Sequence, residues 1–222
     1  MSLDRLLNGG FGKGEMSLIY GEAATGKTTM AIQVAVTAAK MGSKVLFLDA
    51  DHSFTPQRLH QIAGVQNEEI SPFILLFFPE TFSEQRRIVE SLESYVTPSL
   101  GLIIIDSMSS LYRAAFSGPE SVFNLNRDLA RQAAYLSEFS SSHKLVCILT
   151  DQVHARLTPP VADVEPVARR TLSYFPQNII RLRNTPRPNV KEILLEKAGS
   201  ADKNRTSCLA VLGEPGFSDL RS

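Results

Sequence analysis

A glycine-rich loop near the N-terminus constrains the fold of this 222-residue sequence more than any other feature. It reads Gly21-Glu22-Ala23-Ala24-Thr25-Gly26-Lys27-Thr28, which fits the pattern of glycine, any four residues, glycine, lysine and threonine. The loop follows the apolar run 16–20 and opens a stretch of helical periodicity over 27–40. A strand, a glycine-rich loop and a helix in this order predict a phosphate-binding P-loop; a chance match in a turn is the alternative.

The residue types in this loop suit a nucleoside triphosphate. The glycines let backbone N–H groups turn towards the β-phosphate, and the N-terminus of the following helix adds a favourable dipole. Lys27 offers a positive charge to the β- and γ-phosphates, and the Thr28 hydroxyl is a ligand for Mg²⁺. We therefore expect ATP and Mg²⁺ as cofactors. The expected nucleotide-binding residues of the loop and helix start are Gly21, Glu22, Ala23, Ala24, Thr25, Gly26, Lys27, Thr28 and Thr29.

The rest of the sequence alternates between short apolar runs and longer helical stretches. The apolar runs cover residues 16–20, 44–49, 73–78, 102–106 and 145–150, and the helical stretches cover 27–40, 56–63, 83–95 and 120–141. Nearly continuous apolar runs between helices are typical of a parallel sheet that is covered on both faces. Three further runs near the C-terminus, joined by short turns, predict a partly antiparallel edge; they cover 178–183, 192–197 and 207–212. The predicted fold class is α/β.

A second Mg²⁺ ligand is expected at the end of another central strand. Asp106 directly follows the apolar run 102–105, which is where the Walker B carboxylate of P-loop proteins lies. The alternative is that Asp106 caps the next helix. The P-loop favours the metal-binding role.

Composition and charge exclude several classes of protein. Lys and Arg number 23, as do Asp and Glu, so a uniformly basic nucleic-acid coat and an acidic tail are both excluded. Basic residues nevertheless exceed acidic ones over residues 151–205, where a polyanion would be met. The sequence has two cysteines, no apolar run of membrane-spanning length and no pattern typical of a signal peptide. We expect a cytoplasmic protein without a membrane anchor.

Four segments resemble the RecA-like ATPase core of archaeal and eukaryotic recombinases. They are the opening 3–14, the stretch 47–59, the strand exit Asp106-Ser107-Met108-Ser109-Ser110-Leu111-Tyr112-Arg113, and Thr150-Asp151-Gln152-Val153. They stand in the family's order, and the resemblance covers nearly the whole chain. The short length is similar to that of short archaeal paralogues in the family. The resemblance implies that residues 1–222 form a single RecA-like ATPase core without the family's N-terminal DNA-binding domain.

The resemblance also implies a catalytic role for Lys27 of the P-loop and roles for three residues outside it, Gln152, Arg58 and Asp51. Lys27 and Gln152 would be catalytic, with Gln152 coupling the γ-phosphate to the following loop. Arg58 lies where family members stack a guanidinium on adenine; a solvated helix residue is the alternative. Asp51 stands where the family has a catalytic glutamate. Because aspartate is one methylene shorter and a base must reach water within about 3 Å, we predict weak hydrolysis of ATP to ADP and phosphate.

Two segments correspond to the DNA loops of the family. The first covers residues 114–120 and has Pro119 where an arginine is usual, so a phosphate contact is lost. The second begins at Val153 and contains Arg156, Arg169 and Arg170, which we predict to contact DNA. A solvated loop with incidental arginines is the alternative.

These features together predict an ATP-binding, DNA-binding accessory protein of homologous recombination and DNA repair, with a weak ATPase. Its expected partners are single-stranded or branched DNA and repair proteins such as the main recombinase or a junction nuclease. The inter-protomer linker motif of filament-forming recombinases is not found, which leaves a homodimer or assembly on a partner open. The alternatives are an active recombinase, a KaiC-like ATPase that does not bind DNA, and a scaffold in which ATP only sets the fold.

Overall fold

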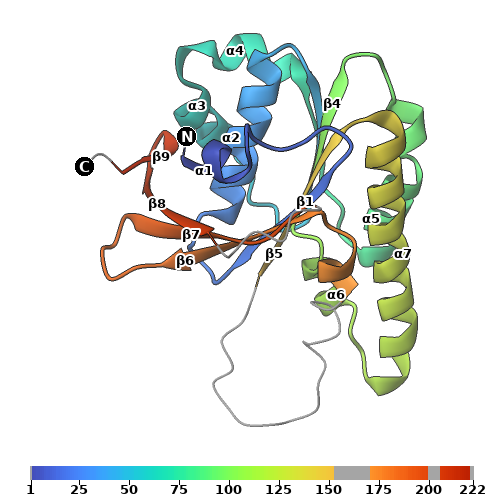
Figure 1. Ribbon diagram of the computed structural model, residues 1–222. Helices are drawn as coiled ribbons and strands as arrows, with labels where there is room; N and C mark the ends of the chain where they lie inside the picture. The colour runs from blue at the N-terminus through green and yellow to red at the C-terminus, as the bar shows by residue number, and fades with distance from the viewer. Residues whose placement is uncertain (1, 153–170, 200–205, 221–222) are drawn as a thin grey trace.

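The computed structural model describes residues 2–152, 171–199 and 206–220, and its centre is one nine-stranded sheet (Figure 1). The strand order is β3-β2-β4-β5-β1-β6-β7-β8-β9. The strands are β1 (Met16–Gly21), β2 (Lys44–Asp49), β3 (Ile74–Phe77), β4 (Leu100–Asp106), β5 (Val146–Gln152), β6 (Asn178–Asn184), β7 (Val190–Ala198), β8 (Thr206–Gly213) and β9 (Gly216–Asp219). Strands β1 to β6 pair in parallel, and β6 to β9 pair antiparallel. The α/β fold with an antiparallel C-terminal edge is confirmed.

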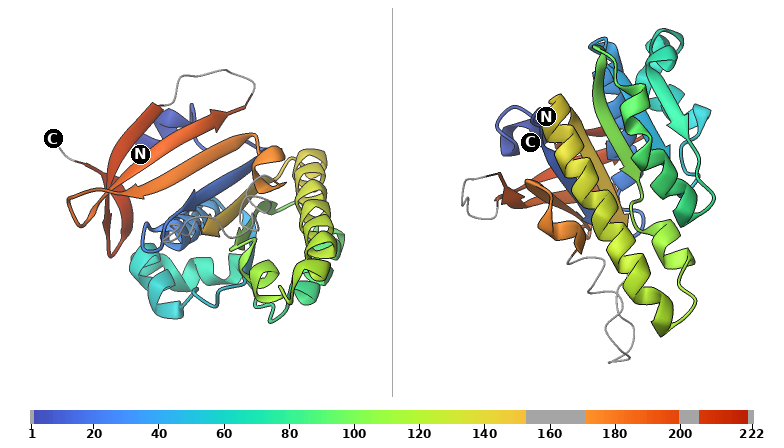
Figure 2. Two further views of the ribbon diagram at one scale, coloured as in Figure 1. Left: turned by 90° about the horizontal axis from the view of Figure 1, so that it is seen from below. Right: turned by 90° about the vertical axis from the view of Figure 1, so that its right-hand side faces the viewer.

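Helices cover both faces of the parallel half of the sheet (Figure 2). They are α1 (Ser2–Leu6), α2 (Lys27–Lys40), α3 (Pro56–Ala63), α4 (Asn67–Ile70), α5 (Phe82–Glu90), α6 (Ser110–Ala114) and α7 (Pro119–His143), with 3₁₀ turns at Gly64–Gln66, Ser71–Phe73 and Leu92–Tyr95. One core joins α5 and α7 to the sheet and includes Leu129 and Leu136. The other joins α2 and α3 to the opposite face and includes Met30 and Ile32. Burial on both faces explains why the central strands read as continuous apolar runs.

The predicted helix over 83–95 is split in the structure. Helix α5 starts one residue after Thr81, whose side chain accepts a hydrogen bond from Glu84 N, and it ends at Glu90. The Ser91 hydroxyl donates to Ile88 O at 2.8 Å, and a separate 3₁₀ turn follows at Leu92–Tyr95. A serine that bonds to the carbonyl of its own turn competes with the helix ladder, which accounts for the interruption.

The elements that were not expected from the sequence include the helices α1, α4 and α6 and the edge strand β9. The three helices span only four or five residues each, too few for periodicity to show. Strand β9 is joined to β8 by the two-residue turn Glu214-Pro215, with Gly213 paired to Gly216. Gly216 has a φ of 101°, a conformation that favours glycine. The chain thus returns along β8 and brings Phe217 into the core on the α2 side.

In the parts of the chain that the structure describes, every helix is too short or too polar to cross a lipid bilayer.

Candidate nucleotide-binding site

The glycine-rich loop leaves the end of β1 and turns sharply into α2. Ala24 and Gly26 have φ values of 60° and 95°, so both lie in the left-handed region, which allows a tight turn within the loop. A Cβ atom on Gly21 would lie 2.4 Å from the Leu182 carbonyl oxygen of β6, and only glycine fits there. Gly26 is the N-cap residue of α2, and no side chain that the structure describes caps this helix. The first N–H groups of α2, which point towards the N-terminal end of the helix, are therefore left to bind an anion held in the loop.

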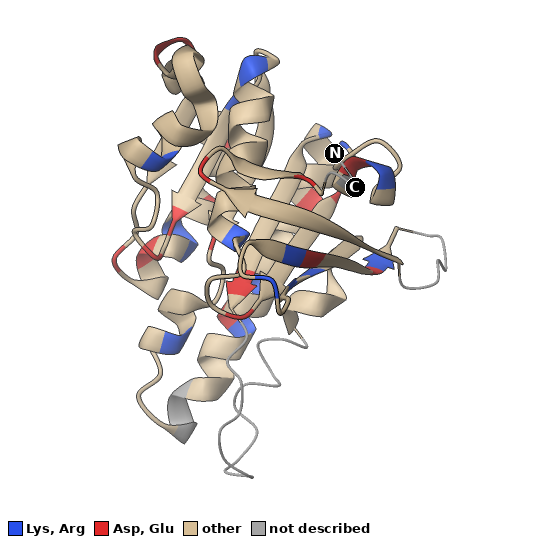
Figure 3. Ribbon diagram, turned by 90° about the vertical axis from the view of Figure 1, so that its left-hand side faces the viewer, with Lys and Arg blue, Asp and Glu red and all other residues tan. Residues whose placement is uncertain are grey.

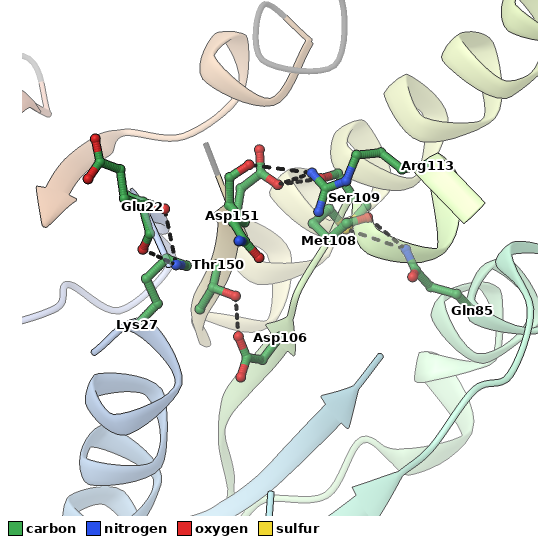
Figure 4. Close-up of polar contacts among 11 residues, drawn as sticks. Glu22, Lys27, Gln85, Asp106, Met108, Ser109, Arg113, Thr150 and Asp151 are labelled. Carbon is green, nitrogen blue, oxygen red and sulfur yellow. Dashed lines mark hydrogen bonds and ion pairs between the residues drawn. The ribbon is translucent and has the colours of Figure 1, made fainter. Parts of the chain in front are cut away.

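Lys27 lies at the start of α2 with its ammonium group folded towards the loop (Figure 4). Its Nζ donates to the carbonyl oxygens of Gly21 at 3.0 Å and Glu22 at 2.8 Å. Burial lowers the pKa of Lys27, while the negative charges of Asp106, Asp151 and Asp51 raise it. A partly desolvated cation with several acidic neighbours is positioned to meet a polyanion at the loop.

Asp106 ends β4 beside the P-loop helix and is nearly fully buried. The Thr150 hydroxyl donates a hydrogen bond to Asp106 Oδ1, while Oδ2 is buried and has no hydrogen-bond partner among the described residues. Burial raises the pKa of Asp106, and the nearby Thr150 and Thr28 hydroxyls oppose that shift. The N-cap residue of the next helix, α6, is Ser109, so Asp106 does not take the capping role that was its alternative.

A buried carboxylate oxygen without a partner, next to a threonine hydroxyl, fits a Mg²⁺ ion. Mg²⁺ prefers oxygen ligands and is commonly bound by one or two protein groups, water and phosphate oxygens. Within the described ranges, no group of three or more His, Cys, Asp or Glu side chains could hold a metal ion without such additional ligands. The donor set therefore suits a cation that arrives with a nucleotide.

Two aspartates at the end of β2 have different surroundings. Asp49 is buried; its Oδ2 accepts a hydrogen bond from Phe54 N at 2.7 Å, and its Oδ1 accepts one from the Ser53 hydroxyl at 3.3 Å. Asp51 is exposed in the turn that these bonds stabilise, and its charge acts on Lys27. Asp51 thus follows the carboxyl end of β2, near enough to the P-loop for its charge to act on Lys27. Its role as the catalytic base stays a prediction.

A polar cluster joins the end of β5 to α6. Ser109 donates a hydrogen bond to Asp151 Oδ1, and Arg113 Nη1 donates to Ser109 Oγ at 2.6 Å and to the Gln152 carbonyl oxygen at 3.4 Å. Arg113 also forms an ion pair with Asp151 at 3.6 Å. Gln152, the last residue of β5, is paired in register with Gly21 of β1. Gln152, which is predicted to sense the γ-phosphate, is therefore held at its backbone carbonyl by Arg113 of α6.

Sequence reasoning did not assign this cluster, although Ser109, Arg113 and Asp151 belong to the segments that resemble the recombinase core. Ser109 and Asp151 are 42 residues apart in the sequence, so no local pattern shows that they are in contact. Burial raises the pKa of Asp151, whereas the Ser109 hydrogen bond and the Arg113 charge lower it. The cluster satisfies this carboxylate within the protein.

Arg58 is half-buried and its guanidinium donates four hydrogen bonds, so it is not the solvated helix residue of the alternative interpretation. Its Nη1 donates to Gln61 Oε1 at 2.9 Å and to Glu214 O at 2.7 Å. Its Nη2 donates to Thr29 Oγ1 at 3.1 Å and to Gly213 O at 3.5 Å. The guanidinium thus lies between α2, α3 and the β8–β9 turn. Adenine stacking on it stays a prediction.

The predicted DNA-contact residues Arg156, Arg169 and Arg170 lie outside the described residues. Pro119 begins α7, which follows α6 and the short connection after it. Strands β6 and β7 carry both basic and acidic residues (Figure 3), and Arg181 pairs with Glu196 at 4.0 Å and Arg183 with Glu192 at 3.7 Å. These two arginines thus have acidic partners within the sheet.

The fold and the loop geometry define a protein with a RecA-like P-loop core. The family model described as Rad51 matches residues 1–172. The DNA repair and recombination protein RadB of Thermococcus gammatolerans is 38% identical over 199 residues, covering 88% of this chain and 86% of that protein. The RadB proteins of Thermococcus kodakarensis and Methanococcoides burtonii are 37% identical over 88% and 32% identical over 82% of this chain, and cover 86% and 80% of those proteins.

A solved structure described as the crystal structure of the RadB recombinase superimposes with a TM-score of 0.80 at 34% identity. The superposition covers 99% of this chain and 97% of that one. The chain therefore belongs to the Rad51 family and, within it, to the archaeal RadB proteins.

Proposed function

We propose that this chain is an ATP- and Mg²⁺-dependent, DNA-binding accessory protein of homologous recombination and DNA repair, with a weak ATPase. The observation that carries the nucleotide part is the P-loop beside Asp106 and its unpartnered buried oxygen. The names of the relatives, DNA repair and recombination protein, support the biological process.

Nucleotide binding uses groups that the fold already brings together. The N–H groups at the start of α2 and the Lys27 ammonium bind the phosphates. Thr28 and Asp106 would hold Mg²⁺, which supplies charge neutralisation to the phosphates when bound. Gln152, fixed at its backbone by Arg113, reports the γ-phosphate to the segment that follows β5.

Weak hydrolysis follows from the position and length of Asp51. An exposed aspartate in a turn must reach the attacking water directly or through a second water. Loss of an effective base forfeits a factor on the order of 10²–10⁴ in rate. ATP then acts mainly as a ligand that changes the state of the protein, and DNA contact rests on the arginines predicted in the second loop.

An active recombinase is the second candidate, because the solved relative is described as a recombinase. The two candidates differ in what DNA does to ATP turnover. An engine of strand exchange couples hydrolysis to DNA, whereas an accessory protein with a poor base hydrolyses ATP slowly with or without it.

The test is steady-state ATP turnover with and without single-stranded DNA. Lys27→Ala supplies the background, since it removes the phosphate-facing charge and should abolish ATP binding. Lys13→Ala, a change at an exposed lysine before β1, is the matched control and should behave as wild type. We expect slow turnover that DNA does not change, together with clear ATP binding. Strong stimulation by DNA would favour the recombinase, and undetectable ATP binding by the wild type would refute the proposal.

A further inference from the structure

The β8–β9 hairpin is attached to the P-loop helix by a side chain that acts as a strand partner. Gln33 of α2 donates from Nε2 to the Phe217 carbonyl oxygen at 2.9 Å, and its Oε1 accepts from Phe217 N at 2.7 Å. Strand β9 is the edge of the sheet, and these two bonds join its backbone to α2. The Phe217 side chain is buried in the core on the same side.

The hairpin also touches the P-loop itself. A Cβ atom on Gly26 would lie 2.7 Å from Phe217 Cζ and 3.0 Å from Leu212 Cδ2. Both side chains come from the hairpin, so its packing reaches the loop residue that precedes Lys27. The C-terminal edge of the sheet therefore forms one wall beside the nucleotide site.

Arg58 connects this wall to the two helices of the site. Two of its four hydrogen bonds go to backbone carbonyls of the turn, Gly213 O and Glu214 O, and the others go to Thr29 and Gln61. Guanidinium N–H bonds lie in the plane of the group. These four bonds therefore fix the orientation of the plane while they leave its two faces to stacking.

We propose that the β8–β9 hairpin is a positioning element of the base subsite: it holds Arg58 as a planar platform for the purine base of the bound nucleotide. This inference rests on the proposed nucleotide binding and adds the part of the chain that controls it. Gln33 and the turn carbonyls act through Arg58. Their contribution concerns the base, whereas the P-loop concerns the phosphates.

Reciprocity then links the base to the hairpin. If the hairpin favours base binding by positioning Arg58, a bound base stabilises the hairpin by the same free energy. Inorganic tripolyphosphate, which has no base, occupies the P-loop without that effect. The Phe217 amide, bonded to Gln33 Oε1, reports the attachment directly through its hydrogen exchange.

The experiment measures the affinities of Gln33→Ala and wild type for ADP and for inorganic tripolyphosphate. We expect Gln33→Ala to lower ADP affinity about tenfold, the usual worth of a desolvated stacking contact, and to leave tripolyphosphate affinity unchanged. Thr37→Ala is the matched control one turn along α2, since its exposed hydroxyl bonds to Gln33 O within the helix. Equal losses for both ligands, or no loss for ADP, would overturn the inference.

Arg58→Lys tests the platform without disturbing the hairpin core. Lysine keeps the charge but has no planar fork, so ADP affinity should fall while tripolyphosphate affinity stays. In the double variant with Gln33→Ala the losses should be less than additive, because both act on the same platform. In wild type, ADP should slow exchange of the Phe217 amide and tripolyphosphate should not; the reverse would contradict the inference. A wild type that binds neither ligand refutes the proposed function instead.

Discussion

Asp106 and Asp151 lie at the ends of neighbouring strands, yet their surroundings are opposite. Both are buried, and burial raises the pKa of each. Asp106 keeps one buried oxygen without a partner among the described residues and lies beside Thr28 of the P-loop helix. Asp151 is bonded to Ser109 and paired with Arg113 on the α6 side (Figure 4).

The difference shows that the same end of a sheet can carry one aspartate with partners in the protein and another that is partly unsatisfied. A carboxylate whose partners are all supplied by the protein stabilises the fold and has little capacity left for a ligand. A carboxylate left partly unsatisfied costs folding free energy but can bind a cation when one arrives. We therefore propose that Asp106 binds the ligand and that Asp151 connects β5 to α6.

The largest expected effect is that of Asp106→Asn on ATP turnover. The amide cannot replace an anionic Mg²⁺ ligand, so turnover should fall roughly a hundredfold or more. The same change removes a buried charge, so the protein without nucleotide should become more stable to thermal unfolding. Turnover assays and thermal melts with and without Mg²⁺ and ATP check both parts. If Asp106→Asn keeps Mg²⁺-dependent ATP binding, Asp106 is not a ligand of the Mg²⁺ ion.

Asp151→Ala should lower the stability of the protein and leave its affinity for nucleotide nearly unchanged. It leaves the Ser109 hydroxyl and the Arg113 guanidinium without their carboxylate, so the free energy of unfolding should fall by about 2 kcal/mol. Asp151→Asn is the matched control: it keeps an acceptor for Ser109 and should change stability by less than about 1 kcal/mol. Denaturant titrations measure both, and ADP affinity should change little in either. A large loss of ADP affinity would mean that Asp151 contacts the nucleotide.

The sequence was sufficient for the groups whose signals are local. The P-loop, helix α2 over 27–40 and strand β2 over 44–49 each carry a motif or a periodicity within one stretch, and the structure has the same bounds. Asp106 could be placed because it ends an apolar run beside a P-loop. The position of these residues is thus settled by patterns only a few residues long.

The contacts that sequence reasoning missed join segments far apart in the chain. Gln33 and Phe217 are 184 residues apart, and Arg58 and Glu214 are 156 apart. Nothing in either local stretch shows that β9 will lie against α2. The turn Gly213-Glu214-Pro215-Gly216 could have indicated a hairpin, but not which helix it would meet.

The smallest expected effect is a pH dependence of stability that separates the two aspartates. Because burial raises the pKa of Asp106 above its ordinary value of 3.8, the native state binds more protons than the unfolded state between 3.8 and the raised pKa. The free energy of unfolding contributed by this group therefore falls as pH rises through that window. The stability advantage of Asp106→Asn over wild type should accordingly grow as pH rises through that window and then level off.

Nucleotide with Mg²⁺ then distinguishes the two positions. A cation beside Asp106 favours its ionised form and lowers its pKa, so saturating Mg²⁺ and ADP should flatten the pH dependence of the wild type relative to Asp106→Asn. Asp151→Asn should show a dependence of the same sign, because burial raises the pKa of Asp151 as well. That dependence should persist with ligand, since Arg113 and Ser109 already surround the carboxylate. Flattening at Asp151 but not at Asp106 would reverse the assignment of the two residues.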